Sequence, residues 1–323
     1  MVKSVTESQV VTANNKSFSK FVPMLQLAWD STSLGALKTC PRYYLYNIIY
    51  GYSTKAENVH LVFGSYLHSA VEHYYHCRAN GFDHKTAVES TTLAMLEVTF
   101  DKVLKRPWFS DEPTKNRMSL IRAVVWYLDK HEHDNMTTVI LKNGKPAVEL
   151  SFRHETGLTT DLTDEEYLLC GHLDRVVEWN ESIYGMDHKT TKSAIYDDFF
   201  QKFSPDNQIS LYMLSGQVVL DIPMKGFIID GIQVGATFAR FQRGVVTRTK
   251  NQLNEWFKDL QFWLRQAETF AEQEYYPMNE KSCSNYGGCP YRQVCGASPE
   301  ARPQLLQHLY HRRVWDPLTT RGV

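Results

Sequence analysis

Two β-favouring segments joined by a tight polar turn constrain the fold of this chain more than any other feature. Residues 176–179 and 183–186 are rich in valine, isoleucine and aromatic residues, and the polar triplet Asn180-Glu181-Ser182 stands at their junction. This pattern is typical of a β-hairpin. We therefore expect two adjacent antiparallel strands inside the stretch 171–212.

Two carboxylates and one ammonium group converge on this expected hairpin. Asp174 and Asp187 lie on adjacent strands, and Lys189 shares the face of Asp187 because side chains alternate along a strand. A hard divalent cation such as Mg²⁺ takes one or two carboxylates, and a lysine beside it can orient the water that attacks a phosphate. A D-x-K pattern alone also fits a surface ion pair, so the other elements decide between the two interpretations.

A helix expected at 205–220 carries Gln208 and Tyr212 one turn apart and facing the same way. The ordered set D-x(12)-D-x-K followed by Q-x(3)-Y resembles the PD-(D/E)XK nuclease superfamily, specifically its RecB-like branch. The resemblance implies that Asp174, Asp187 and Lys189 are catalytic and that Gln208 and Tyr212 act at the same site.

An earlier helix, expected at 62–78, presents His68 and Glu72 on one face. A histidine on such a helix is ordinarily a core or surface residue. The pattern G-x(3)-H-x(3)-E, placed before the first catalytic strand, resembles the helix motif of RecB-like nucleases, in which the histidine is a metal ligand. The resemblance implies that role for His68 and a supporting role for Glu72.

The resemblance further implies a metal-dependent phosphodiester hydrolase. One or two Mg or Mn ions are expected on Asp174, Asp187, His68 and the backbone carbonyl of His188, with Lys189 positioning or activating water. We expect a DNA exonuclease that acts on single-stranded DNA or duplex ends in recombination, repair or phage DNA processing, with a helicase or recombination protein as its partner.

Two other functions stay open. One is a catalytically silent subunit that binds DNA ends or acts as a scaffold in a larger complex. The intact Asp174, Asp187 and Lys189 weigh against it, because a silent homologue has no need for adjacent carboxylates that are costly to bury. The other is a structure-specific endonuclease, which shares the chemistry and differs in its substrate.

The pattern as a whole predicts an α/β fold with a central mixed sheet flanked by helices, and the resemblance implies that this sheet is restriction-endonuclease-like. We expect a flexible arm at 1–23, a nuclease domain at 24–300 with a helical insertion at about 80–135, and a tail at 301–323. Other expected helices lie at 34–46, 86–105, 118–131, 249–274 and 305–315, and other expected strands at 137–141, 147–154, 226–235 and 237–246.

Three of the six cysteines, Cys283, Cys289 and Cys295, cluster near the C-terminus, and Cys40 stands near the N-terminus. An odd local cluster cannot pair within itself, which favours metal ligation. The arrangement resembles iron-sulfur RecB-like nucleases such as AddB and the CRISPR-adaptation nucleases, in which a cluster joins the two ends of the domain. The resemblance implies a 4Fe-4S cluster on these four residues. The first spacing departs from that family's pattern, so a four-cysteine zinc site stays as the alternative, although zinc favours a C-x(2-4)-C pair that is absent here.

Composition argues against a strongly basic nucleic-acid-binding protein and against a membrane-spanning one. The 323 residues are 43% hydrophobic, which allows one elaborated domain or two packed lobes, and the net charge is −1. A near-neutral chain does not hold nucleic acid by its overall field, so DNA binding requires a local groove. Residues 1–20 are polar and no apolar run is long enough to span a membrane, and we expect a cytoplasmic protein.

Overall fold

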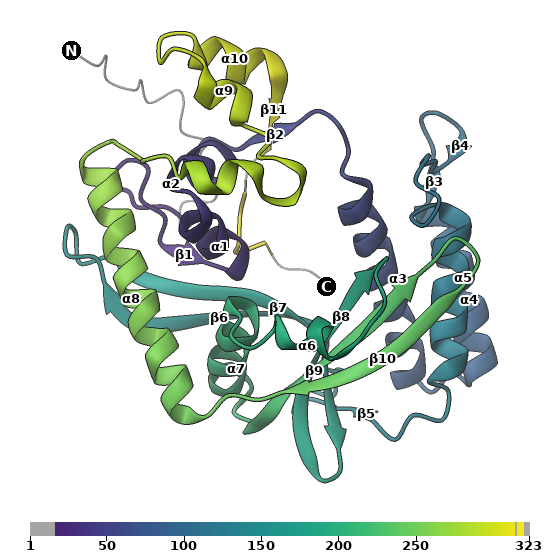
Figure 1. Cartoon of the computed structure of the whole chain (residues 1–323). Coiled ribbons are helices and arrows are strands. Elements are labelled where there is room, and N and C mark those ends of the chain that lie inside the picture. Colours follow the sequence, from purple (N-terminus) through teal and green to yellow (C-terminus); the bar gives the residue numbers. More distant parts are fainter. Residues whose placement is uncertain (1–16, 314, 320–323) are drawn as a thin grey trace. The chain divides into compact units, whose positions relative to one another are not determined.

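A computed structural model describes residues 17–313 and 315–319 (Figure 1). The chain divides into two compact units. Among the described residues, the first contains 17–56, 153–171, 249–313 and 315–319, and the second contains 57–152 and 172–248. In the described part of the chain, no helix is long and apolar enough to cross a membrane.

The second unit is built on a mixed sheet. Strand β7 (Glu166–Trp179), which belongs to this unit from His172 onward, pairs antiparallel with β8 (Ser182–Thr191). Strand β8 runs parallel to β9 (Met224–Val234), and β9 pairs antiparallel with β10 (Ala239–Val246). Two further strands pair with β7: β5 (Thr137–Thr138) and β6 (Val148–Thr159), of which β6 belongs to this unit only up to Phe152.

The predicted hairpin is confirmed. Strands β7 and β8 are joined at Asn180 and Glu181, whose φ angles are 47° and 57°. Two consecutive residues with positive φ form the turn whose twist matches that of the flanking strands. The pairing of Arg175 with Met186 and of Trp179 with Ser182 fixes the register, and this register sets Asp174 and Asp187 on neighbouring strands.

Three helices form a layer of their own in the second unit: α3 (Val59–Ala79), α4 (His84–Val98) and α5 (Arg117–Lys130), seen together in Figure 1. Asn58, Asp83 and Asn116 cap their N-termini through side-chain hydrogen bonds. Their buried residues share a core with Ile232 and Val234 of β9. Two more helices, α6 (Asp197–Gln201) and α7 (Asn207–Leu220), follow β8.

The helix expected at 86–105 is wrong in its second part. Helix α4 ends at Val98, and a hairpin of β3 (Phe100–Asp101) and β4 (Arg106–Pro107) follows. Asp101 causes this change, because its Oδ1 accepts hydrogen bonds of 2.9 Å from the backbone N–H groups of Val103 and Leu104. An aspartate that bonds its own downstream backbone favours a turn over a helix.

The first unit is mainly helical. Its short strands pair locally: β1 (Ala28–Trp29) is parallel to Leu168 and Leu169 of β7, and β2 (Tyr52–Thr54) is antiparallel to β11 (Tyr310–Arg312). The helix expected at 305–315 is therefore wrong beyond Leu309. The helices are α1 (Ser31–Thr39), α2 (Pro41–Tyr44), a π-helical turn (Leu45–Ile49), α8 (Lys250–Glu272), a 3-10 helix (Glu280–Gly287), α9 (Arg292–Gly296) and α10 (Arg302–Leu309).

The expected arm at 1–23 falls only partly within the structure. Residues 1–16 lie outside the described residues. Ser17 is fully buried, and its carbonyl oxygen accepts a hydrogen bond of 2.8 Å from the backbone N–H of Leu27. Ser19 donates a backbone hydrogen bond to Leu25, also at 2.8 Å.

Candidate active site

Strands β7 and β8 bring Asp174, Asp187 and Lys189 together in the second unit. The ammonium nitrogen of Lys189 lies 2.7 Å from Oδ2 of Asp187. The side chain of Asp187 is 3% exposed and that of Asp174 is 13% exposed, whereas Lys189 keeps 29% of its side chain accessible. The site is therefore a buried pair of carboxylates with a partly accessible lysine beside it.

The two carboxylates have opposite electrostatic environments. Burial disfavours ionisation of Asp174, but the charge of His68 and hydrogen bonds from His188 and His68 outweigh it and hold the pKa of this carboxyl well below its usual range. Burial and the negative charge of Asp174 raise the pKa of Asp187, although Lys189 opposes the shift. Asp174 therefore relies on His68 for compensating charge, and Asp187 relies on Lys189.

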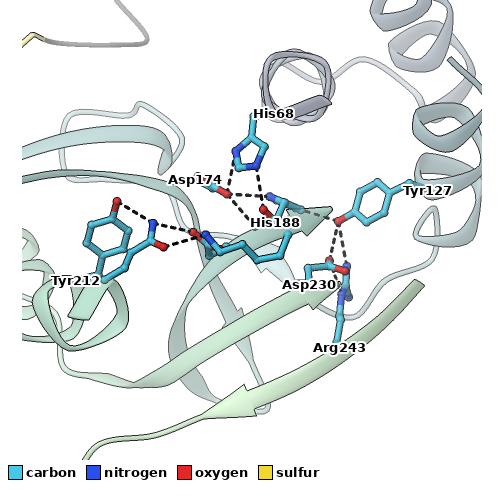
Figure 2. A network of polar contacts seen from close by, with 10 residues as sticks. His68, Tyr127, Asp174, His188, Tyr212, Asp230 and Arg243 are labelled. Atoms are coloured by element: carbon cyan, nitrogen blue, oxygen red, sulfur yellow. Dashed lines mark hydrogen bonds and ion pairs between the residues drawn. The ribbon is translucent and has the colours of Figure 1, made fainter. Parts of the chain in front are cut away.

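His68 on α3 lies at the same site, as Figure 2 shows. Its Nδ1 is 3.3 Å from Oδ2 of Asp174, and its Nε2 is 2.9 Å from the carbonyl oxygen of His188. Burial by itself would lower the pKa of His68, but the charges of Asp174 and Asp187 prevail and raise it to about 9. Glu72, expected to support His68, lies 3.8 Å from Nε2 of His76 on the same helix.

Helix α7 contributes the predicted glutamine and tyrosine. Gln208 Oε1 accepts a hydrogen bond of 2.9 Å from Lys189, and Gln208 Nε2 donates to Asp187 Oδ1 and to the Tyr212 hydroxyl, both at 3.2 Å. Asp206 caps this helix by accepting from the backbone N–H of Ile209. The amide of Gln208 thus holds both charged groups of the D-x-K element.

Sequence reasoning missed a second group of polar residues behind His188. The His188 ring is 2% exposed; its Nε2 lies 3.1 Å from the Tyr127 hydroxyl, which donates a hydrogen bond of 2.8 Å to Asp230. Arg243 donates to Asp230 at 2.7 Å and to Asp134 at 2.5 Å. The one available signal was that Asp230 directly follows the apolar run Phe227-Ile228-Ile229 inside strand β9.

The donor set fits a hard divalent cation in part. Two carboxylates and a peptide carbonyl are oxygen ligands of the kind that magnesium and manganese prefer. Oδ2 of Asp187 is buried and accepts no hydrogen bond, since Lys189 approaches it as an ion pair without hydrogen-bond geometry. Across residues 17–313 and 315–319, however, no group of three or more His, Cys, Asp or Glu side chains has the arrangement of a metal site.

The four cysteines expected to form a cluster lie in the first unit. The backbone N–H of Asn279 donates to Sγ of Cys40 at 3.3 Å, and the N–H of Cys289 donates to the carbonyl oxygen of Cys283 at 2.9 Å. Burial raises the pKa of the Cys289 and Cys295 thiols, and nearby thiols, including that of Cys40, add to both shifts. The four residues are neighbours, yet among the described residues their thiols do not have the arrangement of a metal site either.

A comparison with protein-family models gives the family of this chain. A family model described as the PD-(D/E)XK nuclease superfamily matches residues 29–296. No curated protein matches the chain. Two of the solved structures that match are a provisionally named exonuclease from Eubacterium rectale and a protein called SSO0001. The first is 12% identical with a TM-score of 0.49, and the match covers 80% of this chain and 86% of that one. The second is 10% identical with a TM-score of 0.32, covering 73% and 94%.

The family match spans most of the chain and includes every residue of the site described above. The mixed sheet of the second unit, with its flanking helices, is consistent with that family. The chain belongs to the PD-(D/E)XK nuclease superfamily.

Proposed function

We propose that this protein is a metal-dependent DNA exonuclease that hydrolyses single-stranded DNA or duplex ends. The observation that carries the proposal is the convergence of Asp174, Asp187 and Lys189 with His68 at one point of the sheet. Its setting would be recombination, repair or phage DNA processing, together with a helicase or recombination partner.

In this proposal Asp174, Asp187, His68 and the carbonyl oxygen of His188 hold one or two magnesium or manganese ions. Such an ion supplies Lewis-acid stabilisation of charge on the phosphate and makes water a better nucleophile. Lys189 orients the water and offsets phosphate charge. Burial alone would lower the pKa of Lys189, but Asp187 raises it, so the ammonium form persists. Gln208 keeps this ammonium beside Asp187.

The burial of the acidic residues supports a preference for flexible DNA. Carboxylates that are 3% and 13% exposed would hold an ion below the surface, and a phosphate reaches that ion only if the strand can bend toward it. A single strand or a frayed end can do so, whereas the interior of a stiff duplex bends at a considerable energetic cost. This supports an enzyme that starts at ends or on single strands.

The test is digestion of end-labelled single-stranded DNA with Mn²⁺ by the wild-type protein, Asp187→Asn and Lys189→Ala. Lys192→Ala is the matched control, because Lys192 is exposed in the segment after β8. We expect the wild type and the control to shorten the strand and both site variants to fail. Circular single-stranded DNA should stay intact, since an exonuclease cannot start without an end.

Other outcomes select the alternatives. Cleavage of the circular strand would replace the exonuclease with a structure-specific endonuclease. A wild-type protein that binds DNA ends but is as inert as Asp187→Asn would indicate a silent scaffolding subunit.

We also propose that Cys40, Cys283, Cys289 and Cys295 hold a 4Fe-4S cluster. The support is that the thiols of Cys289 and Cys295 interact electrostatically with their neighbours, and that Asn279 ties the Cys40 segment to the C-terminal one. Anaerobically purified protein should be brown and should lose colour and folding together in Cys283→Ala. Cys77→Ala, a buried thiol of the second unit, should stay coloured. A colourless wild type that contains zinc would favour the zinc alternative.

A further inference from the structure

We infer that Tyr127, Asp230 and Arg243 are positioning residues that set the affinity of the site for a divalent cation by fixing His188. The inference deepens the proposed function and rests on it. None of the three residues contacts Asp187, and each acts through the His188 ring (Figure 2).

His188 is the residue through which such a network can reach the site. Its backbone N–H donates to Oδ2 of Asp174 at 2.9 Å, and its ring Nδ1 lies 3.3 Å from the same oxygen. Its carbonyl oxygen lies 2.9 Å from Nε2 of His68. A rotation of this peptide or ring would therefore displace both Asp174 and His68.

Contacts at both ring nitrogens hold the ring of His188 in its orientation. Tyr127 has one hydroxyl proton, and it donates that proton to Asp230 over 2.8 Å. The hydroxyl oxygen also lies 3.1 Å from Nε2 of His188 and accepts a hydrogen bond of 3.4 Å from Nη2–H of Arg243. Nε2 of His188 thus faces Tyr127 while Nδ1 faces Asp174, so each side of the ring has its own partner.

Arg243 anchors this chain of contacts to the rest of the unit. Asp230 is fully buried, Arg243 is 15% exposed and Asp134 is 11% exposed, so the ion pairs form away from water. Asp230 lies opposite His188 in the parallel β8–β9 pair, and Arg243 lies opposite Asp230 in the β9–β10 pair. Three strands and helix α5 thereby converge on one hydroxyl group.

A purely structural role does not explain this arrangement well. A buried ion pair is seldom needed for stability, because apolar residues of equal volume often serve as well. The Tyr127 hydroxyl links the buried Asp230–Arg243 pair to His188, and His188 contacts the proposed ligands Asp174 and His68. Such a link can orient a metal site. Removing such an outer partner typically weakens metal binding about 10- to 100-fold.

The test is the dissociation constant of Mn²⁺ alone, measured by isothermal titration calorimetry on the full chain without DNA. Tyr127→Phe removes the hydroxyl and keeps the ring. Tyr74→Phe is the matched control, because Tyr74 is also buried and its hydroxyl bonds to His84 at 2.9 Å. We expect Mn²⁺ binding about 10- to 100-fold weaker in Tyr127→Phe and unchanged in Tyr74→Phe. Urea unfolding of each variant shows whether it is folded.

Arg243→Lys is the second variant, in case Tyr127→Phe does not fold. It keeps the charge but cannot reach Asp230, Asp134 and Tyr127 together, and its Mn²⁺ binding should also be weaker than that of the wild type. If Tyr127→Phe and Arg243→Lys are folded and bind Mn²⁺ as tightly as the wild type, the inference is overturned and the metal site stands. No Mn²⁺ binding by the wild type would overturn the proposed function and the inference with it.

Discussion

Lys189 on β8 donates a hydrogen bond of 2.9 Å to the side-chain oxygen of Gln208 on α7. The same amide donates to Asp187 at 3.2 Å, so one helix residue restrains both the ammonium and the carboxylate of the D-x-K element. The geometry of Lys189 is therefore set by tertiary contact as well as by its strand.

Gln208→Ala should lower kcat/KM on single-stranded DNA by about 10- to 100-fold, because Lys189 and Asp187 lose their common restraint. The matched control is Gln217→Ala, which removes a partly buried glutamine of the same helix whose contact is with the carbonyl oxygen of Met224. Steady-state rates at saturating Mn²⁺ measure the difference. Equal rates in the two variants would show that Gln208 is only a packing residue.

His68→Gln should make activity depend on a higher Mn²⁺ concentration, with half-saturation raised roughly tenfold or more. The physical reason is the loss of an imidazole that lies 3.3 Å from Asp174 and 2.9 Å from the His188 carbonyl oxygen. His73→Gln is the control on the same helix, since His73 bonds to Ser90 instead. A variant whose rate falls equally at all Mn²⁺ concentrations would argue against a ligand role.

The hairpin and its three charged residues could be predicted from sequence because their determinants are local. Alternation along a strand places Lys189 beside Asp187, and a polar triplet marks the turn. The helical positions of His68, Gln208 and Tyr212 also follow from local periodicity. Periodicity alone does not show that these three residues meet at one site. That expectation came from the family resemblance.

The network behind His188 could not be predicted in this way. Tyr127, Asp230 and Arg243 come from α5, β9 and β10, and no pattern in the chain links them before the sheet forms.

The hairpin after α4 was missed for a different reason. The segment following Val98 keeps apolar residues at helical spacing, while a single side chain, Asp101, bonds the backbone of Val103 and Leu104 into a turn.

Gly185→Ala should destabilise the protein by about 1–3 kcal/mol, because a Cβ at this position of β8 would overlap the buried ring of Phe227 on β9. Urea unfolding measures the change. Phe227→Leu should recover part of the loss when combined with Gly185→Ala. Gly35→Ala is the control, since Gly35 lies in α1 and a Cβ added there would meet nothing within 4 Å; it should be neutral or stabilising by up to about 1 kcal/mol.

Mild acidification should remove a stabilising contribution of His131. Burial and the nearby charge of Arg243 lower the pKa of His131 from 6.5 to about 4, and its side chain is 14% exposed. Between pH 6.5 and about pH 4, His131 is therefore protonated in the unfolded chain and neutral in the folded chain. The stabilising contribution is present above pH 6.5 and is lost as the pH falls toward 4.

From pH 7.5 to pH 5 this one group should reduce the free energy of unfolding by about 2 kcal/mol. Urea unfolding in the presence of EDTA measures the slope. His131→Gln should flatten it, whereas His133→Gln, which removes a histidine that is 91% exposed, should keep the wild-type slope. If the free energy of unfolding falls by the same amount in His131→Gln and the wild type, the acid sensitivity arises elsewhere. His131 would then accept its proton without disturbing its packing against Tyr127 and Phe241.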